Sequence, residues 1–328
     1  MAESTPTALI PWRLATGLFA VAGLLLLFLH FAEIDRLVSL AREARPVWLL
    51  AALALQFMTY FCLAQGWKGV LGRSGHDVAL AKLVPVALMK LFADQAMPSA
   101  GIGGHIVTIG RMRALGVPRP EAMGAVLLTL IGYYLSYAVC ALAMLVIMWL
   151  ASEVSRWLAG VVTLFLVVAV AVPSLALWVR RRGAAPLPAW LEGIGPARRV
   201  LHLIGTAPAE LLRRPGLIVR VTLWNGLIFL LDAASLSTCL LALGASAHPT
   251  SAFVALIMAS IASTLSPIPM GLGTFEATSV TMLTMTHIPL EKAVAATLLL
   301  RGLTLWLPLL PGLVLLRGAH EERGDDPD

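Results

Sequence analysis

Residues 266–289 read SPIPMGLGTFEATSVTMLTMTHIP, and a similar stretch, MPSAGIGGHIVTIGRMRALGVP, fills residues 97–118. Each stretch opens with proline and closely spaced glycines, continues with a run of helix length and ends in another proline. Proline and glycine interrupt helices. Both stretches therefore predict a break in the backbone followed by a short helix.

The two stretches correspond at a shift of 171 residues, which places Pro98 on Pro269 and Pro118 on Pro289. In both halves of the chain the order is an apolar run, a break, a short helix, a proline and a long apolar run. Interrupted apolar segments at matching positions in two halves are the best sequence indication of a transporter binding site.

The chain around these stretches is strongly apolar. Of its 328 residues 59% are hydrophobic and 13% are charged, whereas a soluble domain carries about 25% charged residues. The composition excludes a soluble enzyme, a secreted disulfide scaffold and a disordered chain. Cys62, Cys140 and Cys239 lie far apart inside apolar runs. Their spacing fits no metal site, so we expect buried thiols, no metal and no cofactor.

Six apolar runs are long enough to cross a bilayer, since about 20 apolar residues span its hydrocarbon core. They are 14–31, 47–66, 121–151, 157–178, 216–243 and 293–316. The two interrupted stretches, each with the shorter run before it, predict hairpins over 78–117 and 251–288. The predicted fold class is an all-α polytopic membrane protein with about six full transmembrane helices plus two re-entrant helical hairpins in an inverted repeat.

The basic residues predict the orientation, because they are enriched in cytoplasmic loops. With the N-terminus inside, 17 of the 24 Lys and Arg residues lie on the inner side, 5 lie outside, and Lys90 and Arg301 lie within the membrane. The net charge of +6 is therefore a topology signal and not the mark of a nucleic-acid partner. We expect a multi-pass protein of the bacterial cytoplasmic (inner) membrane with both termini in the cytoplasm.

The predicted domain organisation follows the same pattern. A cytoplasmic N-terminus precedes a single transmembrane domain that consists of two halves joined by a basic cytoplasmic linker, and a charged tail ends the chain. The ranges are 1–13 for the N-terminus, 14–317 for the domain, 47–178 for the first half, 180–215 for the linker, 216–316 for the second half and 318–328 for the tail.

Charged residues within the predicted membrane segments are candidates for function, since each costs about 2.5–3.5 kcal/mol on insertion scales. Glu276 follows the second break and Arg301 lies in the last run. We expect them to pair, either as a structural lock or to hold a charged headgroup. Lys90 and Asp94 are four residues apart on one helix face and either neutralise each other or bind substrate. His105 is the repeat partner of Glu276 and is a further candidate.

Other candidates are uncharged or lie elsewhere. Asn225 and Asp232 are seven residues apart, so they share a helix face that we expect to point into the bundle. Glycines in the two breaks permit tight turns, and the amides at the start of the helix that follows attract anions such as phosphate. These glycines are Gly103, Gly104, Gly271 and Gly273.

At these residues the chain resembles the lysylphosphatidylglycerol synthase transmembrane region family, also called flippase-like integral membrane proteins. PIPMGLGTFEA (267–277) resembles the family's P-x-P-G-G-x-G-x-x-E motif, with Met270 where glycine is usual. LLLRGLTLWLPLLPGL (298–313) resembles the family's arginine-containing last span. The resemblance covers roughly residues 10–317 and implies functional roles for Glu276 and Arg301.

The first stretch departs from the family's pattern. The family's pattern has Gly-Gly followed by an acidic residue and, three residues further on, an arginine. Here His105 stands at the acidic position and Thr108 at the arginine position. Arg111 or Arg113 is left open as a replacement for that arginine.

The resemblance implies movement of an amphipathic phospholipid or lipid-linked intermediate between leaflets. We expect a lipid translocase, not an enzyme, whose partners are membrane lipids with an anionic or phosphate-bearing headgroup. A homodimer and a partner enzyme of lipid synthesis are left open. The alternatives are a transporter of a small anionic solute and a non-transporting membrane partner of a lipid-modifying enzyme.

Overall fold

The computed structural model describes residues 42, 44–96, 102–151, 156–182, 208–246 and 248–308, and all regular structure within these ranges is helical. Four of the described helices are long and apolar enough to cross a membrane. They are α2 (Pro46–Arg73), α5 (Arg119–Leu150), α6 (Arg156–Arg182) and α10 (Pro215–Ala242). The helices predicted over 47–66, 121–151, 157–178 and 216–243 are thereby confirmed.

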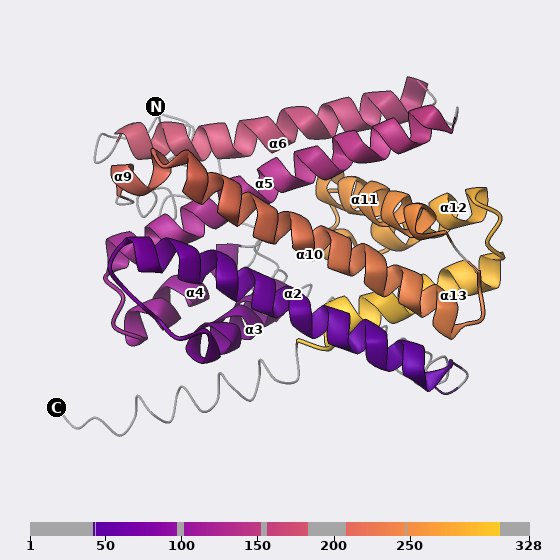
Figure 1. Ribbon diagram of the computed structural model, residues 1–328. Coiled ribbons are helices and arrows are strands. Elements are labelled where there is room, and N and C mark those ends of the chain that lie inside the picture. Colours follow the sequence, from indigo (N-terminus) through magenta and orange to yellow (C-terminus); the bar gives the residue numbers. More distant parts are fainter. Residues whose placement is uncertain are drawn as a thin grey trace, which may run out of the picture. The chain divides into compact units, whose positions relative to one another are not determined.

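Each interrupted stretch and the shorter run before it form two short helices that pack against each other (Figure 1). The first pair is α3 (Leu80–Ala96) and α4 (Ile102–Ala114), and the second is α11 (Pro249–Leu265) and α12 (Thr274–Met285). The second pair is joined by a break over 266–273 that contains the short 3-10 helix η1 (Pro269–Gly271). At 1.5 Å per residue the longest of these helices measures about 26 Å, less than a hydrocarbon core of about 30 Å.

The remaining described elements follow the linker and the second pair. A single turn, α9 (Ala209–Leu212), precedes α10. The last apolar run begins as α13 (Leu290–Arg301) and continues as the π-helix η2 (Gly302–Trp306). The predicted span 14–31, Pro98 with the first break (97–101), most of the linker (183–207) and the tail (318–328) lie outside the described residues.

The prolines set the helix starts, because proline fits the first turn of a helix, where no amide partner is needed. Pro46, Pro215 and Pro249 are the first residues of their helices. α2 extends beyond the predicted span: the apolar run ends near residue 66, and the helix continues to Arg73. Hydropathy marks where side chains become polar, whereas the backbone hydrogen bonds of a helix continue beyond that point.

The two halves repeat one order of elements. The helices α2 and α10 each have 28 residues, α3 and α11 each have 17, and α4 and α12 have 13 and 12. α2 and α10 make the most extensive contact between any two described elements. They run antiparallel (Figure 1), so that the start of α2 meets the end of α10: the Arg45 N–H donates to the Ala242 carbonyl at 2.9 Å.

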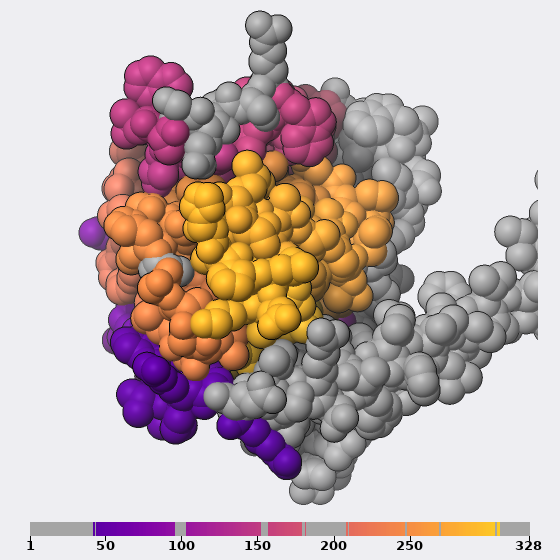
Figure 2. Space-filling view, turned by 90° about the vertical axis from the view of Figure 1, so that its right-hand side faces the viewer, coloured from indigo at the N-terminus to yellow at the C-terminus, as the bar shows by residue number. Residues whose placement is uncertain are grey.

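Because the equivalent helices are antiparallel, the two short pairs lie toward opposite ends of the long helices. In Figure 1 α3 and α4 lie on the left and α11 and α12 on the right. Figure 2 looks onto this right-hand end, where orange and yellow residues of α11 to α13 form much of the face.

Apolar side chains fill the interior and also cover much of the outside. One buried cluster includes Tyr60, Trp67 and Met112, and a second includes Tyr137 and Phe165. Large apolar side chains are exposed along α5 and α6, and they include Leu142, Val146, Trp149, Leu150, Trp157, Leu164, Val167 and Val170. Tryptophans near the helix ends match the aromatic belts at membrane interfaces. The protein is membrane-integral, with its apolar outer faces turned to lipid.

The three cysteines are free and buried, as predicted. Among the described residues no group of His, Cys, Asp and Glu side chains is arranged to hold a metal ion.

Candidate functional site

Arg301 and Glu276 form a buried ion pair at the second break. The Arg301 Nε donates to Glu276 Oε1 at 2.5 Å, and the side chains are 8% and 19% exposed. The Arg301 Nη2 donates to the Met270 carbonyl at 3.2 Å. The guanidinium carbon lies 4.8 Å from the centre of the Phe275 ring, within the range of a cation–π contact. The pairing predicted from the sequence is therefore present.

The backbone of the second break is shaped around this pair. Met270 and Gly271 both have left-handed backbone angles, with φ of 58° and 60°. A side chain at position 271 would collide with the Ser263 side chain and backbone, so only glycine fits there. The Met270 carbonyl is thereby turned toward Arg301. Met270 departs from the usual glycine but still adopts the conformation that glycine favours.

Glu276 has a second role at the start of α12. Its Oε2 accepts a hydrogen bond of 2.7 Å from the Gly273 N–H. This is the reach-back contact of a capping box, in which a glutamate in the first turn satisfies an amide just before the helix. The Glu276 carboxylate therefore stabilises the positive N-terminal end of α12 through Oε2, and its Oε1 binds Arg301.

The first break carries the same chemistry on different residues. The Lys90 Nζ lies 2.6 Å from Asp94 Oδ2, and the Gly104 N–H at the start of α4 donates to Asp94 Oδ1 at 3.0 Å. A side chain at position 104 would collide with the Asp94 carboxylate. Each break therefore combines a carboxylate, a cation and an amide at the start of the following short helix.

The carboxylate of the first break comes from α3 and not from α4. His105, which occupies the family's acidic position, is partly buried next to Gly104, and no hydrogen bond to its imidazole is found among the described residues. Thr108 donates to the Gly104 carbonyl of its own helix at 2.8 Å. Arg111 and Arg113 lie in the last turn of α4, two turns beyond His105. Asp94 thus takes the place that the sequence motif leaves without an acid.

This arrangement changes what the helix starts can bind. The sequence predicts that their amides attract an external phosphate, but two of these amides already bond to carboxylates of the protein, Gly104 to Asp94 and Gly273 to Glu276. Gly103 also has a partner. The Gly104 and Gly273 amides are therefore not free to bind an external anion.

A hydrogen bond joins the first pair of short helices to the last helix. The Gln95 Nε2 donates to the Thr304 carbonyl at 2.9 Å, and these residues are 209 positions apart in the sequence. Gln95 directly follows Asp94, and Thr304 lies one turn after Arg301. This contact therefore joins residues that are close in sequence to the charged groups of the two breaks.

Asn225 and Asp232 lie apart from this contact. The Asn225 amide donates to the Val221 carbonyl of its own helix at 2.8 Å and is buried. Asp232 accepts a hydrogen bond of 3.3 Å from Gln56 on α2. The Asp232 side chain belongs to the seam between α2 and α10, and no hydrogen bond joins Asn225 or Asp232 to Arg301 among the described residues.

Sequence reasoning missed three of these polar groups. Gln56 and Tyr60 lie in an apolar run without any motif, and Gln95 directly follows Asp94 without a motif of its own. The Gln56 Oε1 and the Tyr60 hydroxyl are buried without a hydrogen-bond partner among the described residues. The available signal was the presence of polar residues inside an apolar run, since such residues usually face the interior of the helix bundle.

The second break can hold an anion at Arg301. A guanidinium has five N–H donors in a plane, and the described residues supply acceptors only to its Nε and Nη2. The planar donors of arginine match the oxygens of a phosphate or carboxylate. Glu276 positions the guanidinium, so an anion arriving there would find its donors already oriented.

The comparisons with known proteins give the family. The model described as "Lysylphosphatidylglycerol synthase TM region" matches residues 14–312, a range that includes both breaks and Arg301. A search of curated proteins finds no match. The match spans most of the chain and agrees with the resemblance at 267–277 and 298–313. The chain therefore belongs to the lysylphosphatidylglycerol synthase transmembrane-region family.

Proposed function

We propose that this protein is a lipid translocase, which moves a phospholipid or lipid-linked intermediate with a phosphate-bearing headgroup between the leaflets of the bacterial inner membrane. The family supports a function connected with membrane lipids. The observation that carries the proposal is Arg301, a cation buried at a backbone break and held by Glu276 and the Met270 carbonyl. Transport, rather than catalysis, is the proposed activity.

The proposed topology makes the two short pairs re-entrant hairpins that enter from opposite faces. Irregular backbone at membrane depth is tolerated only where protein or water surrounds it, and the second break joins two helices that pack against each other. The antiparallel run of α2 and α10 supports an inverted repeat. The excess of basic residues on one side supports cytoplasmic termini.

In the proposed mechanism the headgroup phosphate binds Arg301 while the acyl chains remain in the bilayer. Charge-assisted hydrogen bonds from a guanidinium to phosphate are among the stronger protein contacts. Lys90 is the cation of the other break, and the Gln95–Thr304 contact links the two. Rocking of one half against the other would then expose the headgroup alternately to the two faces.

The test is translocation in liposomes that contain the purified protein and a fluorescent phospholipid. A membrane-impermeant reductant bleaches only the outer leaflet. We expect most of the label to become accessible in protein-containing vesicles and about half in protein-free vesicles. Lipid accessibility that stays at the protein-free level contradicts the proposal.

A second readout in the same vesicles separates the alternatives. Uptake of a small radiolabelled anion without lipid movement would favour a solute transporter. Absence of both activities would favour a non-transporting partner of a lipid-modifying enzyme. Mass spectrometry of lipids that copurify with the protein then identifies the headgroup.

A further inference from the structure

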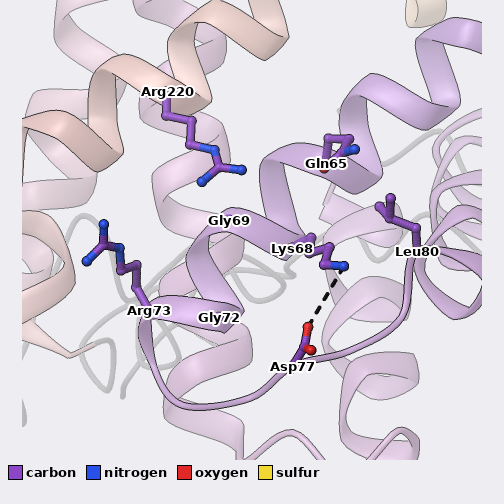
Figure 3. A pocket seen from close by; sticks show the side chains of 8 residues that line it. All are labelled: Gln65, Lys68, Gly69, Gly72, Arg73, Asp77, Leu80 and Arg220. Atoms are coloured by element: carbon purple, nitrogen blue, oxygen red, sulfur yellow. Dashed lines mark ion pairs between the residues drawn. The ribbon is translucent and has the colours of Figure 1, made fainter.

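A pocket of about 410 Å³ lies between the end of α2, the loop that follows it and the beginning of α10 (Figure 3). Its lining residues are Gln65, Lys68, Gly69, Gly72, Arg73, Asp77, Leu80 and Arg220. A second pocket of about 190 Å³ is lined by Arg73, Arg214, Gly216, Leu217 and Arg220. Because two arginines line both pockets, we treat the two as one site, the α2–α10 basic pocket.

The charges of this pocket are unbalanced. Lys68, Arg73, Arg214 and Arg220 supply four cations, and Asp77 is the one carboxylate among the lining residues. The Lys68 Nζ lies 3.9 Å from Asp77 Oδ1, and the Asp77 side chain is 88% exposed. An exposed ion pair of this kind contributes little to the stability of the fold. Among the described residues the three arginines have no ion-pair partner.

The packing of the two helices holds Arg220 in this position. A Cβ atom at Gly69 would lie 3.2 Å from the Arg220 Nε and 3.4 Å from its guanidinium carbon. Glycine at position 69 therefore lets the Arg220 side chain of α10 lie directly against α2. In Figure 3 the Arg220 guanidinium reaches down toward Gly69.

The pocket also has an apolar side. Leu80 and Leu217 line it beside the cations. It lies at the end of the long helices that is opposite to the Arg45–Ala242 contact. Cations next to apolar side chains at the end of a membrane helix match a phosphate attached to an acyl-bearing glycerol, because basic pockets between membrane helices bind anionic headgroups.

We propose that the α2–α10 basic pocket binds a phosphate group, carried by a lipid headgroup at the membrane surface or free in solution. Arg73 and Arg220 donate to the phosphate oxygens, and Lys68 and Arg214 add positive charge. The site is separate from Arg301 and does not depend on translocation.

The test measures binding to the purified full chain in detergent. The probes are inorganic phosphate, a short-chain phosphatidic acid, and a diacylglycerol with the same acyl chains and no phosphate. All variants carry Glu276→Gln and Arg301→Gln, so that the proposed translocation site does not contribute. The variants compared are Arg73→Gln with Arg220→Gln, Gly69→Ala, and the control Arg213→Gln, whose exposed cation lies outside the pocket.

We expect the double arginine variant to bind the phosphate probe roughly tenfold more weakly, because charged hydrogen bonds are lost. Gly69→Ala should weaken binding less than the double arginine variant does, because it displaces the Arg220 side chain but keeps the Arg220 charge. Alanine also favours the helix, so this variant should still fold. Arg213→Gln should bind the phosphate probe as tightly as the parent protein, which carries only Glu276→Gln and Arg301→Gln.

The probes identify the source of the phosphate. If phosphatidic acid binds and inorganic phosphate does not, the ligand is a lipid headgroup, whereas equal binding of inorganic phosphate identifies a free anion. Unchanged affinity in the double arginine variant, an equal loss in Arg213→Gln, or equal binding of diacylglycerol overturns the proposal.

Discussion

At the scale of single residues, each break compensates its charges within the protein. Asp94 pairs with Lys90 and Glu276 pairs with Arg301, and each carboxylate also accepts an amide hydrogen bond. A charged side chain at membrane depth is costly without such partners. Both charge pairs are therefore satisfied within the protein, and in the proposed mechanism a headgroup phosphate has to compete with a carboxylate for each cation.

The Glu276–Arg301 pair gives a prediction for stability. Glu276→Gln and Arg301→Gln alone each leave one buried charge without its partner, so each should lower the free energy of unfolding by about 3 to 5 kcal/mol. The double variant places two amides opposite each other and should recover most of that loss. Thermal unfolding in detergent measures both effects, with the exposed Glu291→Gln as the control. A loss in the double variant equal to the sum of the two single losses would show that the charges do not interact.

The contact at Gly104 gives a second prediction. In Gly104→Ala the new methyl group would collide with the Asp94 carboxylate, which should cost about 1 to 3 kcal/mol, as overpacking does. Gly110 on the same helix faces open space, so Gly110→Ala should be neutral or stabilising by about 1 kcal/mol or less. The two melting temperatures are compared directly. A Gly104→Ala protein as stable as Gly110→Ala would exclude the close Asp94 contact.

At the scale of elements, the sequence predicted most helices and few of their contacts. Long apolar runs and prolines located α5 and α10 to within about two residues, because both signals act locally. The bonds from Asp94 to Gly104, Gln56 to Asp232 and Gln95 to Thr304 join residues 10, 176 and 209 positions apart. Such contacts depend on how helices pack, which the local pattern does not contain.

The hairpin topology gives an element-scale prediction for cysteine accessibility. Asp77→Cys and Arg113→Cys flank the pair α3–α4, and Thr250→Cys and Met285→Cys flank the pair α11–α12. With an impermeant thiol reagent on intact cells, we expect the first two cysteines to stay unlabelled and the second two to react. The native cysteines are buried and provide a low background.

In inverted membranes the labelling pattern should reverse. If the two cysteines that flank one pair react from opposite sides, that pair crosses the membrane fully and is not re-entrant.

At the scale of the whole molecule, the antiparallel α2 and α10 form the contact between two halves with the same order of elements. If the two halves form the proposed inverted repeat, they would exchange inward-open and outward-open states by similar movements. The Gln95–Thr304 hydrogen bond crosses from one half to the other next to Arg301. Movement of the halves would therefore change the surroundings of Arg301 directly.

The most direct test of Arg301 as the headgroup-binding residue is lipid translocation by the Glu276→Gln/Arg301→Gln double variant. The fraction of fluorescent phospholipid that an impermeant reductant bleaches is measured in proteoliposomes, beside wild type and Glu291→Gln. We expect the double variant to melt close to wild type and yet to leave lipid accessibility at the protein-free level. Translocation by the double variant at the wild-type rate would contradict the role of Arg301.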